Sequence, residues 1–136
     1  MLDAAAGRAP GVTVFGDDYE TRDGTCLRDY VHVSDLARAH MLSLHALSSP
    51  GVCDTYNLGC GGGYTVREVI DAAAHVTGRR IPITIAPRRP GDPAVLVASS
   101  ERIKADFGWS PRVEDLAAII ASAWAWRKRH TRRSVA

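Results

Sequence analysis

The chain has 136 residues, of which 46% are apolar and 24% are charged, and its formal net charge at pH 7 is +2. This composition is typical of a soluble globular protein, and the length favours one domain, 1–136, with its own core. The small net charge does not require an acidic polymer as partner, and no apolar run approaches a membrane span. The three cysteines, Cys26, Cys53 and Cys60, lack Cys-x-x-Cys spacing, which argues against a disulfide framework or a zinc site and favours free thiols in the cytoplasm.

The first predicted element is a short strand at residues 12–15, Val-Thr-Val-Phe, which the turn residue Gly16 ends. Phe15 closes this strand. An aromatic residue at such a position is either part of the core or an exposed ring face for a planar ligand, and the residues alone leave both interpretations open. A polar loop follows.

The stretch at residues 24–35, GTCLRDYVHVSD, carries the first charged pair of interest. Arg28 stands beside Asp29 at the start of an apolar run, and Ser34 and Asp35 are expected to cap the next helix. An arginine guanidinium at a strand edge, close to the start of a helix, can bind an anion. An ordinary strand with a surface ion pair is the simpler alternative.

An amphipathic helix is predicted from Ser34 to Leu47. One side of it collects the apolar residues Val33, Leu36, Ala37, Met41, Leu44 and Leu47. His40 and His45 lie five positions apart on this helix, which is not the spacing of a metal-binding pair. We therefore expect solvated or core histidines and no metal site.

A second strand is predicted at residues 55–58, followed by a glycine-rich turn. Gly59 and Gly61 match the first two positions of the dinucleotide-binding pattern G-x-G-x-x-G. Tyr64 occupies the third position, where close packing of the helix requires glycine. The turn is therefore not expected to bind a cofactor.

The helix at residues 65–77 has the clearest local signals. Thr65 and Glu68 form a predicted capping box, and Gly78 is suited to the left-handed position that ends a helix. Its buried stripe is predicted to consist of Val66, Val69, Ile70, Ala73 and Val76.

A strand at residues 81–85 leads into the loop at 86–92, Ala-Pro-Arg-Arg-Pro-Gly-Asp. Its two prolines stiffen a segment that carries arginines and one acid. A guanidinium can meet two phosphate oxygens at once, and a carboxylate can accept hydrogen bonds from a vicinal diol. A charged surface loop is the alternative interpretation.

Three further elements are predicted: a short strand at 95–97, a short helix that begins after Ser99 or Ser100, and a last helix at 113–129. The basic residues from Arg127 to Arg133 could suggest a nucleic-acid surface. Because cations complement the negative end of a helix, we expect no nucleic acid as partner.

Two of these stretches carry a resemblance to a known family. The pattern G-T-x-x-R-D-Y-V-H-V-x-D-L-A at residues 24–37 and the pattern P-R-R-x-G-D at residues 87–92 resemble motifs of UDP-glucose 4-epimerases, in the extended short-chain dehydrogenase family. The resemblance runs from about residue 12 to 130 and covers only the C-terminal part of such enzymes. It implies an α/β fold: the substrate-binding part of an NAD-dependent epimerase/dehydratase, with mixed short strands, about four helices and no N-terminal Rossmann half.

The resemblance also implies roles for particular residues in binding a UDP-sugar. Phe15 would offer its ring to uracil, and Arg28 and Arg89 would contact the diphosphate. Asp92 would contact the ribose, and Leu96 would line the sugar pocket, where its intermediate size leaves the sugar preference open.

Catalysis in this family requires NAD and a Tyr-x-x-x-Lys pair, in which the tyrosine acts as a base on the sugar hydroxyl. No lysine stands four positions after any of the four tyrosines. No catalytic residue is therefore assigned, and Arg88 is expected to be structural.

The resemblance predicts a truncated UDP-glucose 4-epimerase of galactose metabolism that is inactive alone. A separate N-terminal half or a homodimer stays open as partner. The alternatives are a non-catalytic nucleotide-sugar-binding module and a fragment of another NAD-dependent epimerase or dehydratase.

Overall fold

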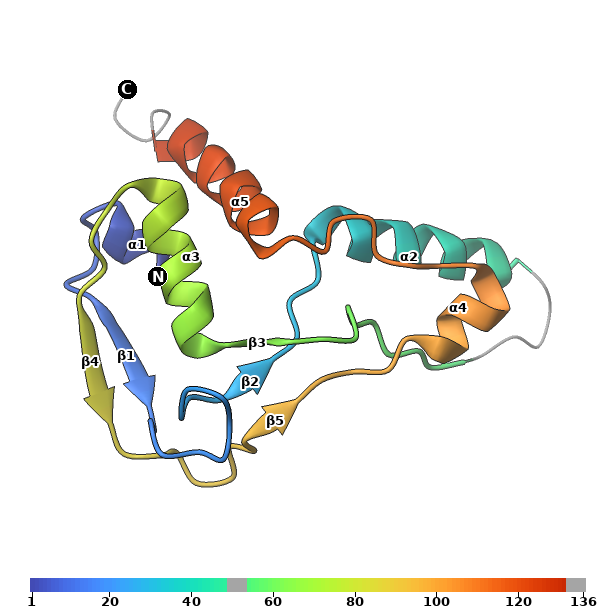
Figure 1. Ribbon diagram of the computed structural model, residues 1–136. Coiled ribbons are helices and arrows are strands. Elements are labelled where there is room, and N and C mark those ends of the chain that lie inside the picture. The colour runs from blue at the N-terminus through green and yellow to red at the C-terminus, as the bar shows by residue number, and fades with distance from the viewer. Residues whose placement is uncertain (49–53, 132–136) are drawn as a thin grey trace.

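A computed structural model describes residues 1–48 and 54–131, and within them the chain alternates short strands with helices (Figure 1). The mixed α/β class is confirmed. The helix additional to those predicted is the single turn α1 near the start of the chain. In chain order the elements are α1 (Leu2–Ala5), β1 (Val12–Phe15), β2 (Leu27–Arg28), α2 (Val33–Ala46), β3 (Tyr64–Thr65), α3 (Val66–Thr77), β4 (Ile83–Ala86), β5 (Val95–Leu96), α4 (Glu101–Phe107) and α5 (Leu116–Thr131).

The strands form two small sheets. β1 pairs with β4 in parallel, with Phe15 opposite Ala86. β2 lies between β3, which is antiparallel to it, and β5, which is parallel to it, with Arg28 opposite Leu96. The end of β1 therefore lies beside the start of the loop at 87–92, and that loop leads back to β5 next to Arg28.

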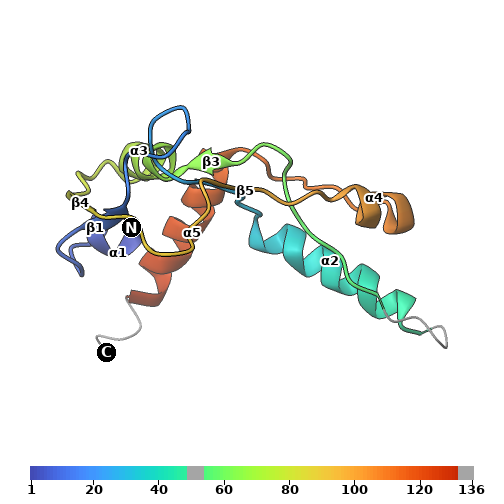
Figure 2. The same ribbon diagram turned by 90° about the horizontal axis from the view of Figure 1, so that it is seen from below.

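Two hydrophobic cores divide the chain into lobes that are joined by β2, β3 and β5 (Figures 1 and 2). The first lobe comprises α1, β1, α3, β4 and α5, and its core includes Val14, Ile70 and Ile120. The second lobe comprises α2 and α4, and Ile103 and Trp109 are buried in its core. The paired strands lie where the two lobes meet.

The predicted capping box of α3 is confirmed. Thr65 Oγ1 accepts the amide of Glu68 at 3.2 Å, and Glu68 Oε2 accepts the amide of Thr65 at 2.9 Å. Gly78 ends the helix with φ of 64°, the left-handed conformation. Thr65 Oγ1 also donates to Asp23 in the loop after β1, so this threonine joins β3, α3 and that loop.

Substitution of Thr65 by valine should lower the free energy of unfolding by about 2 kcal/mol, because a fully buried residue loses both a helix cap and a hydrogen bond to a carboxylate. Urea denaturation would measure the change. Thr13→Val in β1 removes the same hydroxyl from an exposed side chain and should change stability by less than about 0.5 kcal/mol. Equal losses in the two variants would contradict the role given to Thr65.

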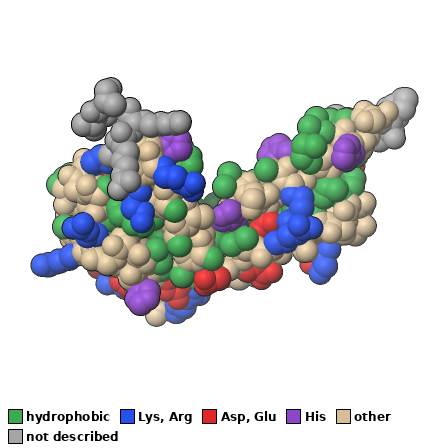
Figure 3. Space-filling view, turned by 90° about the horizontal axis from the view of Figure 1, so that it is seen from above, with side chains coloured by type: hydrophobic (Ala, Val, Ile, Leu, Met, Phe, Trp, Pro, Cys, Tyr) green, Lys and Arg blue, Asp and Glu red, His purple; other side chains and the backbone are tan. Residues whose placement is uncertain are grey.

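Helix α2 presents its apolar side to solvent. Val33, Met41, Leu44 and Leu47 are each more than half exposed, and hydrophobic side chains gather along α2 in Figure 3. The buried residues of the helix are Asp35 and Ala39, on the opposite side. The helix predicted from the amphipathic pattern is confirmed. No described element, however, covers its apolar stripe.

The chain should therefore bind the dye ANS strongly and self-associate. The double substitution Met41→Gln and Leu44→Gln should reduce both the fluorescence and the association, as measured by dye titration and light scattering. Trp126→Gln, which removes an exposed apolar side chain from α5, is the matched control and should have a smaller effect. A sharply melting monomer that binds no dye would contradict this expectation.

Three further local predictions require correction. Residues 55–58 form no strand, because no described strand lies beside them to complete a ladder. Helix α5 begins at Leu116 rather than Val113, after Asp115, whose carboxylate accepts the amide of Ala118 at 2.9 Å. Helix α2 is capped by His32, whose Nδ1 accepts the Ser34 amide at 3.2 Å.

Neither of the serines expected at the start of α4 acts as a normal side-chain cap. Ser100 occupies the N-cap position, but its hydroxyl instead contacts the backbone of Gly59, with 2.7 Å to the amide nitrogen and 2.8 Å to the carbonyl oxygen. Ser99 Oγ makes only a long contact, 3.4 Å, with the Glu101 amide. Ser100 therefore joins α4 to the glycine turn, where the two lobes meet.

Candidate functional site

Asp92 is the centre of a charged cluster formed by the predicted site residues. Its Oδ1 lies 3.4 Å from Arg28 Nη2, and its Oδ2 lies 2.8 Å from Arg89 Nη2 and 2.9 Å from Arg89 Nε. The guanidinium carbon of Arg89 is 4.7 Å from the centroid of the Phe15 ring. Two arginines from separate parts of the sequence therefore converge on one carboxylate beside an aromatic ring.

Leu96 lies next to Arg28 because β2 and β5 pair in parallel. A cavity of about 320 Å³ opens here, lined by Arg28, Asp29, Asn57, Leu96, Val97 and Ala98. Asn57 was not singled out from the sequence, and the strand expected around it gave no signal for a cavity. Arg28 thus belongs both to the charged cluster around Asp92 and to the lining of this cavity.

Asp29 is not the partner of Arg28, contrary to the simpler interpretation of the sequence. Its Oδ1 accepts the amide of Cys60 at 3.0 Å, and its Oδ2 accepts the amide of Ala98 at 3.2 Å. Asp29 thus fixes the glycine turn and the residues after β5, while the guanidinium of Arg28 is left to Asp92.

Arg88 pairs with Asp18 rather than with Asp92, although it is next to Arg89 in sequence. Its Nε donates to Asp18 Oδ1 at 2.6 Å, and its guanidinium carbon lies 4.1 Å from the centroid of the Tyr19 ring. This hydrogen bond lowers the pKa of the Asp18 carboxyl. Arg88 thereby attaches the loop at 87–92 to the loop after β1.

The loop after β1 is held by residues that the sequence analysis did not identify. Arg22 forms an ion pair with Glu68 and lowers its pKa. Asp23 Oδ1 accepts the amide and the hydroxyl of Thr25 at 2.9 and 2.7 Å. No motif marks these contacts, because they join residues more than 40 positions apart or lie within an irregular loop.

Residues 1–120 match the family described as GDP-mannose 4,6 dehydratase. The chain belongs to this family. Among its curated relatives, UDP-glucose 4-epimerase of Halalkalibacterium halodurans is 48% identical over 130 residues, which are 96% of this chain and 39% of the relative. The resemblance to UDP-glucose 4-epimerases that the two motifs indicated is confirmed.

Solved structures of family members agree with the fold. UDP-glucose 4-epimerase of Stenotrophomonas maltophila, with bound NAD and formylated UDP-arabinopyranose, has a TM-score of 0.89 and 44% identity over 97% of this chain and 39% of its own. The Bifidobacterium longum enzyme in complex with NAD⁺ and UDP has a TM-score of 0.86 and 41% identity over 94% and 38%. The chain thus spans about 39% of the length of the relatives it matches, consistent with the predicted C-terminal portion.

NAD is present in these structures of the family, but the glycine turn of this chain does not fit it. A Cβ on Gly59 would lie 2.3 Å from Asp29 Oδ2 and 2.5 Å from the Ala98 carbonyl oxygen. Gly59 is therefore required for packing within the chain, and Tyr64 stands where a dinucleotide loop needs glycine. Packing within the chain, and not the cofactor, therefore explains the glycine at this position of the turn.

Two further chemical features of the described residues are the Cys60 thiol and the metal-ligating side chains. Burial, together with the negative charge of Asp29, raises the pKa of the Cys60 thiol to about 11, so this thiol is protonated at neutral pH. No cluster of three metal-ligating side chains occurs among residues 1–48 and 54–131. In the same ranges, no helix combines the length and apolar character needed to cross a bilayer.

Proposed function

We propose that this chain forms the UDP-sugar-binding part of a UDP-glucose 4-epimerase. The single observation that carries the proposal is the meeting of Arg28, Arg89 and Asp92 beside Phe15. Two guanidiniums suit the two phosphates of a diphosphate, and a carboxylate suits a ribose diol. A ring face suits uracil, for which stacking contributes about 1–3 kcal/mol.

The ligand would rearrange this cluster. Arg89 now lies over the Phe15 ring and on Asp92, so it would turn to the phosphates as uracil takes its place on the ring. Asp92 would exchange its arginine contacts for the ribose hydroxyls. Arg28, which is held closer to the cavity, would remain near its present position, and the sugar would extend toward Leu96 and Asn57.

Hydride transfer in such an enzyme is the chemistry of NAD, and in this proposal the residues of the present chain bind and orient the sugar nucleotide only. We propose that 1–136 acts as one domain and that the complete enzyme serves galactose metabolism. A separate N-terminal half would supply the missing parts, and a homodimer is the alternative partner. The free cysteines Cys26 and Cys60 support a reducing, cytoplasmic location.

A non-catalytic nucleotide-sugar-binding module is the second candidate. The observation that favours it is that none of the tyrosines is followed, four positions later, by a lysine. A fragment of another epimerase or dehydratase is favoured only by the description of the matching family.

Titration calorimetry with UDP, and with GDP as the control ligand, tests the binding site directly. We expect UDP to bind, and the comparison with GDP measures how strongly the site selects the base. Addition of an N-terminal half from a relative, followed by an assay of UDP-galactose conversion, separates the enzyme from the module. Absence of UDP-dependent heat would refute both candidates.

A further inference from the structure

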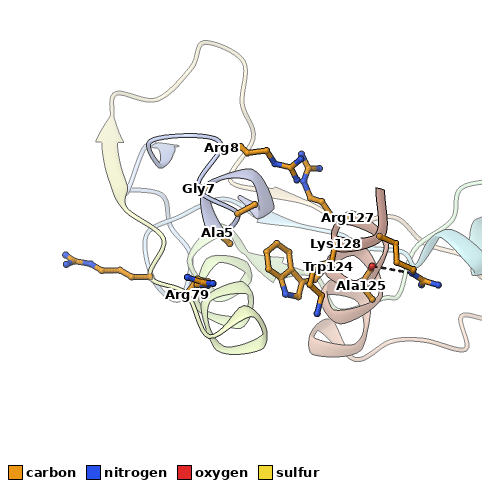
Figure 4. Close-up of a pocket in the computed structure, with 12 residues that line it drawn as sticks. Ala5, Gly7, Arg8, Arg79, Trp124, Ala125, Arg127 and Lys128 are labelled. Carbon is orange, nitrogen blue, oxygen red and sulfur yellow. Dashed lines mark hydrogen bonds between the residues drawn. The ribbon is translucent and has the colours of Figure 1, made fainter. Parts of the chain in front are cut away.

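A cavity of about 950 Å³ lies at the end of the first lobe, and it shares no residue with the cluster around Asp92. Its twelve lining residues come from three segments: residues 4–8, which end α1 and follow it; residues 79–80, between α3 and β4; and residues 124–129 of α5 (Figure 4). Three parts of the chain that are distant in sequence thus enclose one space.

The lining of this cavity is strongly basic. Half of the lining residues carry a positive charge and none carries a negative one: Arg8, Arg79, Arg80, Arg127, Lys128 and Arg129. These are six of the 17 basic residues of a chain whose net charge is only +2. Positive charge is therefore concentrated here rather than spread over the surface, which raises the local concentration of anions.

One carboxylate is shared by two of these guanidiniums. Asp3 Oδ1 lies 3.2 Å from Arg8 Nε and also contacts Arg127 Nη2. Figure 4 shows the side chains of Arg8 and Arg127 pointing toward one another across the cavity. The shared acid brings two planar donors together at the cavity.

Trp124 lies between α3 and α5 in this cavity, with the ammonium of Lys128 5.8 Å from its ring (Figure 4). Arg79 lies at the end of α3, and neither Arg79 nor Lys128 has an acidic partner within the described ranges. The negative end of the α5 dipole favours cations, which explains the positions of Lys128 and Arg129. It does not explain Arg8 and Arg79, which belong to other segments.

The parallel pair β1–β4 separates the two sites. Arg8 and Arg79 precede these strands, whereas Phe15 ends β1 and Arg89 follows β4. Four residues of extended strand span about 13 Å. The basic cavity and the proposed UDP site therefore lie at opposite ends of the same strands.

We propose that the basic cavity is a second anion site, which binds a compact anion with several phosphate groups, independently of UDP. Guanidiniums from different directions can each meet phosphate oxygens with paired hydrogen bonds. Such an anion joins α1, the α3–β4 turn and α5, so its binding stabilises the first lobe. Each bound phosphate also replaces counterions, so affinity falls as salt rises.

Inorganic triphosphate is the probe, titrated calorimetrically in the presence of saturating UDP at about 50 mM and about 200 mM salt. The expected result is binding that weakens with salt and raises the melting temperature. Arg79→Gln combined with Lys128→Gln should weaken it at least tenfold. Arg112→Gln removes one positive charge from an exposed arginine outside the cavity and should change it less than twofold.

The proposal would be overturned by absence of triphosphate binding, by an equal loss in Arg112→Gln, or by competition from UDP. Arg28→Ala separates this test from that of the proposed function, because it should weaken UDP binding by about 30- to 150-fold and leave triphosphate binding intact. A single-stranded RNA of about ten nucleotides forms a further arm. If the RNA bound more tightly than triphosphate, the ligand of the cavity would be an extended phosphate backbone rather than a compact anion. That result would refute the proposal.

Discussion

Replacement of Arg28 by alanine is expected to weaken UDP binding by about 30- to 150-fold, which corresponds to about 2–3 kcal/mol. The loss is large because only 21% of the Arg28 side chain is exposed, so its contact with a charged phosphate would be little screened by water. Arg89 is 60% exposed, and Arg89→Ala should weaken binding by only about fivefold. Titration calorimetry of the two variants would measure both changes.

Neither substitution should unfold the chain. In Arg28→Ala, Asp92 keeps its ion pair with Arg89, and in Arg89→Ala it keeps the contact with Arg28. Arg88→Ala is the matched control, because it removes the same charge from the adjacent position of the same loop. Arg88 contacts Asp18 and Tyr19, so its loss should change UDP affinity less than twofold. Equal effects of the three substitutions would show a diffuse charge effect and contradict the proposed site.

The sequence predicted those parts of the fold that depend on local signals. The capping box at Thr65 and the left-handed Gly78 are backbone preferences of a few neighbouring residues, so they do not depend on what packs around them. The stripe of α3 likewise faces the first core, with Val69, Ile70 and Ala73 buried.

The sequence could not predict which elements pair with a given strand or pack against a given helix face. Residues 55–58 have the composition of a strand, but a strand requires a neighbour, and the described chain offers none there. The apolar side of α2 was recognised by its period, yet periodicity does not say which element covers a face. Asp35 was expected to cap α2, but it is buried and bound by residues more than 70 positions away.

The candidate site was reached through motifs and not through periodicity. The residues at Phe15, Arg28, Arg89, Asp92 and Leu96 were named from a resemblance, and the structure brings them together; their roles toward UDP stay predictions. The motifs did not predict which charged residues of the site form ion pairs with one another. Asp92 serves both arginines, while Asp29, the acid adjacent to Arg28, binds backbone amides instead.

Asp35 is the residue whose loss should destabilise the second lobe most. Its carboxylate accepts the amides of Arg112 and Val113 at 2.9 and 3.0 Å and Arg38 Nη1 at 2.8 Å, and its backbone carbonyl accepts Trp109 Nε1 at 3.0 Å. The side chain is 1% exposed. These bonds attach α2 to the segment that joins α4 to α5, so they connect the second lobe to the first.

Asp35→Ala should therefore lower the free energy of unfolding at pH 7 by about 3–4 kcal/mol, since it leaves two backbone amides and a guanidinium without their buried acceptor. Asp35→Asn, which keeps one acceptor oxygen but no charge, should lose less. Asp71→Ala removes an exposed carboxylate from α3 and should change stability by less than about 0.5 kcal/mol. Urea denaturation of the three variants would measure these differences.

Acid should remove the advantage of the wild-type chain over Asp35→Ala. Burial raises the pKa of Asp35, but the hydrogen bonds from the Val113 and Arg112 amides and the charge of Arg38 outweigh it, so the folded pKa lies below the ordinary value. A carboxyl with a depressed folded pKa stabilises the protein fully above its unfolded pKa, about 3.9, and loses that contribution as the pH falls through the folded value. The gap between the two chains should thus be constant from pH 7 to about pH 5 and narrow below about pH 4. A gap that stays unchanged down to pH 2 would show that Asp35 acts through packing rather than through its charge.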